Sequence, residues 1–148
     1  MTTHVGSGSE GVANLEDLTE AECLDYLAGA EVGRVALVVD GYPAIFPVNY
    51  VLDGEQVLFR TRDGAKLSDA GLNRVAFEVD HVDPATREGW SVLIQGQADD
   101  IGNAIDATSQ RLRRRTLVTW APGTRDRWFV VRPSKISGRR LRVLPLEL

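Results

Sequence analysis

The stretch Gly33–Leu67, GRVALVVDGYPAIFPVNYVLDGEQVLFRTRDGAKL, contains three consecutive strand patterns separated by two tight-turn signals. Asp40-Gly41 follows the first pattern and Asp53-Gly54 follows the second, and both dipeptides tolerate the positive φ angles of hairpin turns. Strands connected in this way pair antiparallel with their neighbours. The predicted strands are residues 34–39, 43–51 and 56–61.

The rest of the chain adds helices and further strands to this nucleus. Thr19 and Glu22 form a capping-box pattern before an apolar stripe, which predicts a first helix that ends at Gly29 or Gly33. Gly96 interrupts a later strand pattern and indicates a bulge or a close approach of another backbone. The other expected elements are helices at 65–71 and about 103–118 and strands at 74–80, 90–101, 127–132 and 135–143, the last broken at Ser137-Gly138.

Six or seven strands joined mainly by short turns predict a mainly β domain with a few helices. The expected architecture is a closed or partly open antiparallel barrel, because the helices are too few for repeated βαβ units. Gly6 and Gly8 precede no strand, which excludes a dinucleotide-binding glycine motif. Residues 1–13 are rich in Gly, Ser and Thr and are expected to form a disordered tail, with residues 14–148 as one domain.

Composition is that of an ordinary globular protein, with 148 residues, 43% of them hydrophobic, and a net charge of −4. No apolar run is long enough for a membrane span, and the tail lacks the apolar segment of a secretory signal. The lone Cys23 permits no internal disulfide, so a cytoplasmic location is expected. His4 and His81 assemble no zinc-ligand pattern, and no metal site is predicted.

Positive charge is concentrated late in the chain. Residues 111–142 hold ten Arg and one Lys against the single acid Asp126, whereas the residues before 111 hold six basic and nineteen acidic side chains. This segment suits three partners: the acidic part of the same chain or of a second copy, an anionic cofactor, or nucleic acid. The segment shows no exposed aromatic stacking pattern among its arginines, which argues against nucleic acid.

A second group of cations follows the third strand of the opening stretch. Arg60, Thr61 and Lys66 place two positive charges and a hydroxyl around a glycine-bearing turn. Arginine and lysine supply charge-assisted hydrogen bonds, and the amides of a following helix add further donors. The group therefore suits a phosphate.

Taken in order, these motifs resemble the pyridoxamine 5′-phosphate oxidase-like family of flavin-binding split β-barrels. The resemblance covers roughly residues 15–142 and is closest to the nitroimidazole-reductase-like and flavin/deazaflavin oxidoreductase branch. It rests on VGRVAL, PVNYV, FRTRDGAKL, VAFEVD, GWSVLIQGQA and ISGRRL. It implies a six- to seven-stranded antiparallel split β-barrel of the FMN-binding type, and a homodimer with the cofactor at the subunit interface.

The resemblance also implies a set of cofactor-binding residues in three groups. The first group, on the second strand, would lie beside the flavin ring; the second, after the third strand, would hold the ribityl phosphate; the third would reach the cofactor from the fifth strand. A Trp and Arg pair that closes the site in the true oxidases corresponds approximately to Trp128 and Arg139. The three groups are Pro47, Val48, Asn49 and Tyr50; Arg60, Thr61, Lys66 and Leu67; and Trp90 and Ser91.

The function that follows is that of an FMN-binding flavoprotein, a flavin-dependent oxidoreductase with a small-molecule substrate that the sequence does not identify. No side chain stands out as an acid or base, which fits a cofactor that carries the redox chemistry itself. One alternative is a deazaflavin-dependent reductase, whose longer anionic cofactor the arginine-rich segment would hold. Another is a non-catalytic binding protein for haem or another anionic ligand. The substrate-phosphate residues of the true oxidases have no clear match, so vitamin B6 oxidation is not expected.

Overall fold

The computed structural model describes residues 11–62, 74–123 and 127–146. Within these ranges the chain forms seven strands and two helices, and every strand pair is antiparallel. The elements are β1 (Gly11–Asp17), α1 (Glu20–Ala28), β2 (Val32–Val39), β3 (Tyr42–Asp53), β4 (Gln56–Thr61), β5 (Arg74–Asp83), β6 (Glu88–Asp100), α3 (Ala107–Arg113) and β7 (Arg127–Pro145).

The strands close into a barrel. Their order is β1-β7-β4-β3-β2-β5-β6, and an additional pairing between β6 and β7 joins six of them into a ring, with β1 attached to β7 outside it. The prediction of a mainly β, antiparallel split barrel is therefore confirmed. The hairpin turn at Asp40 (φ 51°) and Gly41 (φ 80°) has the two positive φ angles that its dipeptide predicts.

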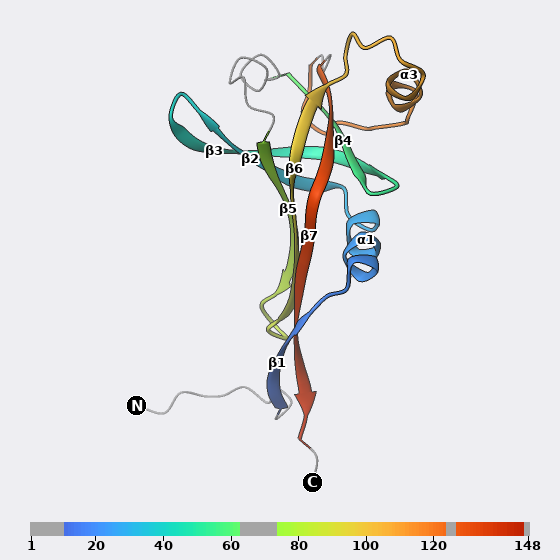
Figure 1. The fold of residues 1–148 in the computed structure, drawn as a ribbon. Helices are drawn as coiled ribbons and strands as arrows, with labels where there is room; N and C mark the ends of the chain where they lie inside the picture. Colours follow the sequence, from blue (N-terminus) through green and yellow to red (C-terminus); the bar gives the residue numbers. More distant parts are fainter. Residues whose placement is uncertain (1–10, 63–73, 124–126, 147–148) are drawn as a thin grey trace.

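The last strand connects three parts of the sheet. β7 pairs with β4 through Arg127–Val131, with β6 through Phe129–Leu141 and with β1 through Arg139–Pro145. It runs nearly the whole length of the molecule (Figure 1). The prediction of two strands, 127–132 and 135–143, was wrong, because pairing with β6 keeps one 19-residue strand continuous.

Ser137-Gly138 does not break β7, and Gly138 is required by close packing. A Cβ there would lie 2.8 Å from the Ser91 carbonyl oxygen and 2.9 Å from Cys23 Sγ of helix α1. The irregularity falls instead between Gln95 and Gly96 of β6, where the register with β7 shifts. The expectation of a bulge or close approach at Gly96 is confirmed.

Helix α1 begins with the predicted capping box. Thr19 Oγ1 accepts a hydrogen bond from the Glu22 amide (3.2 Å), and the Glu22 carboxylate accepts one from the Thr19 amide (3.0 Å). The helix ends at Ala28, with Gly29 as its cap, and buries Cys23 against the sheet. Figure 1 shows it beside the middle of β7.

Helix α3 is shorter than the predicted 103–118. Asp106, not Asn103, caps it by accepting a hydrogen bond from the Ser109 amide (2.9 Å), and the helix ends at Arg113. The residues that follow include Thr116 and Val118, which have low helix propensity. The strand bounds also differ: β5 continues past its predicted end at 80 and β6 begins before 90, so that a tight turn joins them. The helix expected at 65–71 lies outside the described residues.

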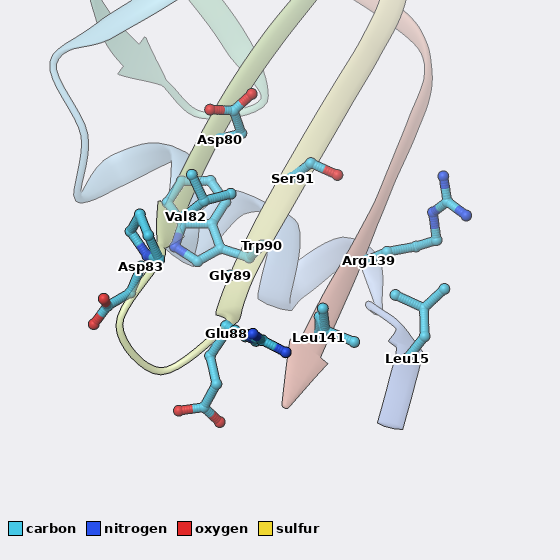
Figure 2. A pocket seen from close by; sticks show the side chains of 12 residues that line it. Leu15, Asp80, Val82, Asp83, Glu88, Gly89, Trp90, Ser91, Arg139 and Leu141 are labelled. Carbon is cyan, nitrogen blue, oxygen red and sulfur yellow. The ribbon is translucent and has the colours of Figure 1, made fainter. Parts of the chain in front are cut away.

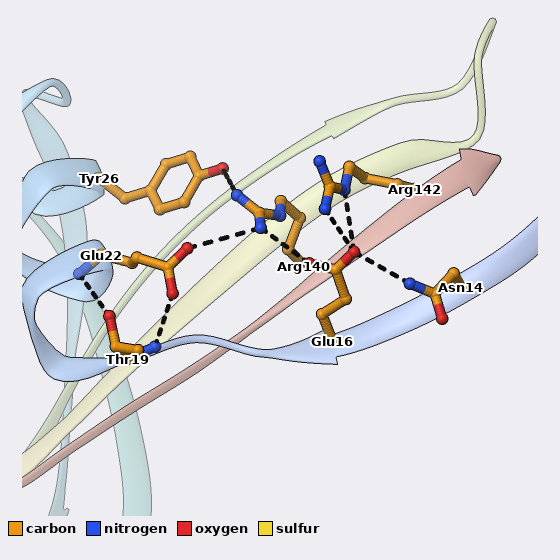
Figure 3. Close-up of polar contacts among 7 residues, drawn as sticks. All are labelled: Asn14, Glu16, Thr19, Glu22, Tyr26, Arg140 and Arg142. Carbon is orange, nitrogen blue, oxygen red and sulfur yellow. Dashed lines mark hydrogen bonds and ion pairs between the residues drawn. The ribbon is translucent and has the colours of Figure 1, made fainter.

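An ion-pair network fastens β1, which includes residues 11–13 of the segment assigned to the tail by sequence. The Glu16 carboxylate accepts hydrogen bonds from Arg140 (2.8 Å) and Arg142 (3.1 Å), and the Tyr26 hydroxyl accepts one from Arg140 (3.3 Å). Figure 3 shows these contacts joining β1, β7 and α1. Hydrogen bonds from Arg140 and then Arg142 lower the pKa of Glu16 to about 2.

The core fills the barrel with apolar side chains from alternate positions of the strands. Phe77 is fully buried and meets the Tyr50 ring edge-on at 5.0 Å, and Phe59 stacks on Phe129 at 5.4 Å. A smaller cluster lies under α3 and comprises Leu58, Ile101, Leu112 and Val130. Among the described helices, none has the length and apolar character needed to cross a membrane.

Candidate cofactor and ligand sites

The PVNY segment of β3 divides its side chains between two faces of the sheet. Val48 and Tyr50 point into the core, with 8% and 3% of their surface exposed, whereas Pro47 is exposed. The Tyr50 hydroxyl donates to the Leu27 carbonyl (2.6 Å), and burial raises the pKa of Tyr50. These two buried side chains serve the fold, so a ligand beside β3 would meet its backbone and its outer side chains.

Asn49 is the half-buried polar residue of that segment and belongs to an internal network. Its Nδ2 donates to the Glu31 carbonyl (3.4 Å), and its Oδ1 accepts from the Trp120 amide (2.8 Å). The network holds the chain near Trp120 against β3 and borders a pocket of about 360 Å³ that also involves Tyr50 and Arg115. Trp120 lies at the edge of this pocket, with 66% of its surface exposed.

Arg60 and Thr61 lie at the end of β4, where they pair with Trp128 and Arg127 of β7. The Arg60 guanidinium lies over the Trp128 ring, 4.6 Å from its centroid, in a cation–π contact. Lys66 and Leu67, the other members of the predicted phosphate group, lie outside the described residues. The described half of that group is thus a cation and a hydroxyl at one end of the barrel.

Trp90 and Ser91 point to opposite faces of β6. Trp90 stacks on Tyr26 of α1, with ring centroids 4.5 Å apart. Ser91 faces the other side, toward a pocket of about 660 Å³ that Trp90 also borders. Figure 2 shows Ser91 in this pocket beside Arg139.

The predicted residues form two groups far apart on one protomer. Arg60 is paired with Trp128, and Ser91 is paired with Arg139, eleven residues further along β7. At the rise of an extended strand, this separation is about 35 Å. One FMN molecule is too short to touch both groups within a single protomer. Trp128 and Arg139 are separated in the same way and form no pair within one chain.

The arginine-rich segment is tied to the chain itself. Arg111 donates two hydrogen bonds to the Asp53 carboxylate (3.0 and 3.1 Å), and Arg115 donates a third (2.7 Å). The Arg111 hydrogen bond is the main cause that lowers the pKa of Asp53. Arg113 donates to the Ile101 carbonyl. Of the three partners considered from sequence, an acid of the same subunit is therefore shown for Arg111 and Arg115.

Sequence reasoning missed most of the residues around the larger pocket. Asp80 and Val82 extend β5 beyond its predicted end, and Leu15 comes from β1, which was not predicted as a strand. The alternation of side chains along β5 was the available signal, since Glu78, Asp80 and Val82 continue one face.

Two of these acids share a cation. Arg34 of β2 lies 3.3 Å from Glu78 and 3.6 Å from Asp80. Burial, and then a hydrogen bond that the protonated Glu78 shares with the neighbouring Asp80 carboxylate as acceptor, raise the pKa of Glu78 to about 7. The folded protein therefore keeps a proton on this carboxyl pair at pH values where an ordinary glutamate is ionised.

This shift predicts a pH dependence of stability. Between pH 4.5 and 7 the folded state holds the Glu78 proton that the unfolded chain has lost, so stability falls as pH rises through that window. Glu78→Gln cannot ionise, and its free energy of unfolding should fall less between pH 5 and 7.5 in urea titrations. Glu55→Gln, in an exposed turn, should follow the wild-type profile. Parallel profiles for all three proteins would contradict the assignment.

The antiparallel ring of six strands, with β1 appended to β7 outside it, defines a split β-barrel. The family model described as pyridoxamine 5′-phosphate oxidase matches residues 19–140, and the chain belongs to that family.

Known relatives agree in sequence and in fold. An uncharacterized protein of Mycobacterium tuberculosis, Rv0080, is 33% identical over 132 residues, covering 84% of each chain. The structure of the FAD binding protein from Mycobacterium smegmatis superposes with a TM-score of 0.70 and 37% identity, over 85% of this chain and 98% of that one. An FAD-binding protein from Mesorhizobium loti shares the fold, with a TM-score of 0.69 and 23% identity over 88% and 98% of the two chains.

Proposed function

We propose that the protein is an FMN-binding oxidoreductase of small molecules, active as a homodimer with the flavin at the subunit interface. The observation that carries the proposal is the Arg60–Thr61 end of β4, where a cation and a hydroxyl precede the glycine and lysine of the same motif. Membership of the family and the 37% identical FAD binding protein support a flavin. When bound, the flavin supplies the redox chemistry, and the chain supplies binding and orientation.

The residues of the β4 end fit the phosphate of such a cofactor. Arginine forms charge-assisted hydrogen bonds to phosphate oxygens, and the contact with Trp128 holds the Arg60 guanidinium in place. Thr61 is half-buried at the last position of the strand. Pro47 and Asn49 present the outer face of β3 on the adjoining strand.

The separation of the two predicted groups supports a dimer. If Arg60 and Ser91 both contact one flavin, the 35 Å estimated between them along β7 requires that they come from different protomers. The cofactor would then be held at its phosphate by one subunit and approached at its ring by Trp90 and Ser91 of the second. Light scattering after size-exclusion chromatography should give the mass of a dimer.

The deazaflavin alternative has less support in the structure. It relied on the arginine-rich segment as a surface for a longer anionic cofactor. Arg111 and Arg115 instead neutralise Asp53, which leaves FMN as the better candidate.

The visible spectrum of freshly purified protein tests the proposal. A flavin band near about 450 nm is expected, and mass spectrometry of the released ligand then distinguishes FMN, FAD, a deazaflavin and haem. The proposal would be refuted by a colourless protein that, at micromolar concentrations, does not quench the fluorescence of added FMN.

The double variant Arg60→Ala/Lys66→Ala should bind FMN at least about 100-fold more weakly, because each lost hydrogen bond to a charged group is worth about 1.5–3 kcal/mol. Fluorescence titration with FMN measures the change. Arg114→Ala/Lys135→Ala removes the same charge from exposed positions and should bind FMN normally. Unfolding of the first variant in circular dichroism would show that the pair is structural.

A further inference from the structure

Two rows of side chains cross the outer face of the sheet near the β5–β6 turn. Directly opposed residues of antiparallel strands point to the same face, so the pairing register defines each row. The polar row is Asp80, Ser91 and Arg139. The apolar row, two residues further along, is Val82, Gly89, Leu141 and Leu15.

The rows enclose a pocket of about 660 Å³ with an apolar floor. This volume lies within the range of small-molecule sites. In Figure 2, Leu15 and Leu141 lie next to each other beneath Arg139, and Val82 lies across Gly89 from them. Gly89 has no side chain between Val82 and Leu141, so the row is hollow at its centre. A Cβ at Gly89 would come within 2.6 Å of the His81 carbonyl oxygen.

The carboxylates around the pocket each have a partner. Asp80 lies 3.6 Å from Arg34, and Asp83 accepts a hydrogen bond from the Ala85 amide (2.9 Å). Glu88 accepts one from the Val143 amide (3.1 Å). The protein itself therefore satisfies the negative charge at this site, at least in part.

The two arginines that line the pocket differ from its acids in having no partner for their side chains among the residues that the structure describes. The side chains of Arg87 and Arg139 make no hydrogen bond or ion pair with any part of the chain that the structure describes. Asp17 stands opposite Arg139 in the β1–β7 register without forming an ion pair with it. Among the charged side chains that line the pocket, the two without a partner within the described ranges are therefore Arg87 and Arg139.

We propose that this face is the substrate site and that it takes an amphipathic carboxylate with a flat apolar body. The body lies over the hollow row, and the carboxylate binds Arg139, with the Ser91 hydroxyl as a further donor. Guanidinium and carboxylate match in a bidentate pair, which favours a carboxylate at this end. The role of this ligand as substrate rests on the proposed flavin function, whereas its binding does not.

The test is calorimetric titration of 2-naphthoate into flavin-free and FMN-saturated protein. We expect a Kd below about 1 mM in both forms, and at least tenfold weaker binding of the neutral 2-naphthamide. Arg139→Gln should weaken naphthoate at least tenfold and leave the amide unchanged. Leu15→Gln, at a 58% exposed position, should weaken both. Arg114→Gln, at the exposed C-cap of α3, should change neither.

Three outcomes would overturn the proposal. Naphthoate could fail to bind, it could bind no better than the amide, or its affinity could survive Arg139→Gln. Displacement of naphthoate by FMN would assign the pocket to the flavin and also overturn it. FMN affinity is measured in the same preparations, so a protein that binds naphthoate but no flavin refutes the proposed function alone.

Discussion

Gly96→Val is expected to prevent the barrel from closing. A Cβ at this position would overlap the carbonyl oxygen of Arg132 on β7, a backbone atom that cannot move without breaking the register. Gly96 lies at the irregularity of the β6–β7 seam, which is the pairing that turns the sheet into a ring. We expect a loss of at least about 3 kcal/mol in the free energy of unfolding, or no soluble protein at all.

The neighbouring exposed position gives a matched control for this substitution. Gln97→Val introduces the same side chain one residue along β6, on the solvent side, and should change stability by no more than about 0.5 kcal/mol. Urea unfolding followed by circular dichroism measures both variants. Wild-type stability of Gly96→Val would mean that the two backbones do not approach each other as described.

Phe77→Ala is expected to cause the second large loss of stability. Phe77 is fully buried, contacts the Tyr50 ring edge-on, and lies so close to Gly33 that a Cβ there would overlap its ring. Truncation removes this contact and leaves a cavity that three strands surround, so we expect a loss of about 3–5 kcal/mol.

Phe77→Leu separates the cavity from the loss of aromatic character. Leucine keeps most of the volume, and this variant should lose less than half as much stability as Phe77→Ala in the same urea titration. Equal losses for the two variants would show that the ring contact with Tyr50, and not the filled volume, is what the core requires.

Local sequence signals predicted the elements that depend on local geometry. Asp40-Gly41 adopts the backbone angles of the turn by itself, and the capping box at Thr19 satisfies the amides of its own helix. These short patterns were therefore sufficient to predict the turn and the start of the helix. Pairing between distant segments has no such signal. Ser137-Gly138 suggests a break when considered alone, but its packing against Cys23 and Ser91 makes it part of a continuous strand.

In the candidate site, too, sequence predicted the local arrangement of residues but not the distances between distant segments. The sequence predicted that Arg60 and Thr61 lie together and that Trp90 and Ser91 lie on one strand, as they do. It did not predict that these pairs lie eleven residues apart along β7, because only the register of long-range pairs fixes that distance. Asp53 is a further example, since its role in the hairpin pattern concealed its ion pairs with Arg111 of α3 and with Arg115 just after that helix.

Because one strand completes three pairings, the order in which the chain is synthesised matters for this protein. β2 to β6 can pair as they leave the ribosome, but β1, β4 and β6 each keep an unpaired edge until Arg127–Pro145 becomes available. Unpaired edges are templates for association with other chains. The interval before β7 emerges is therefore the period in which the nascent protein is most exposed to aggregation, and the ring closes only after that strand has become available.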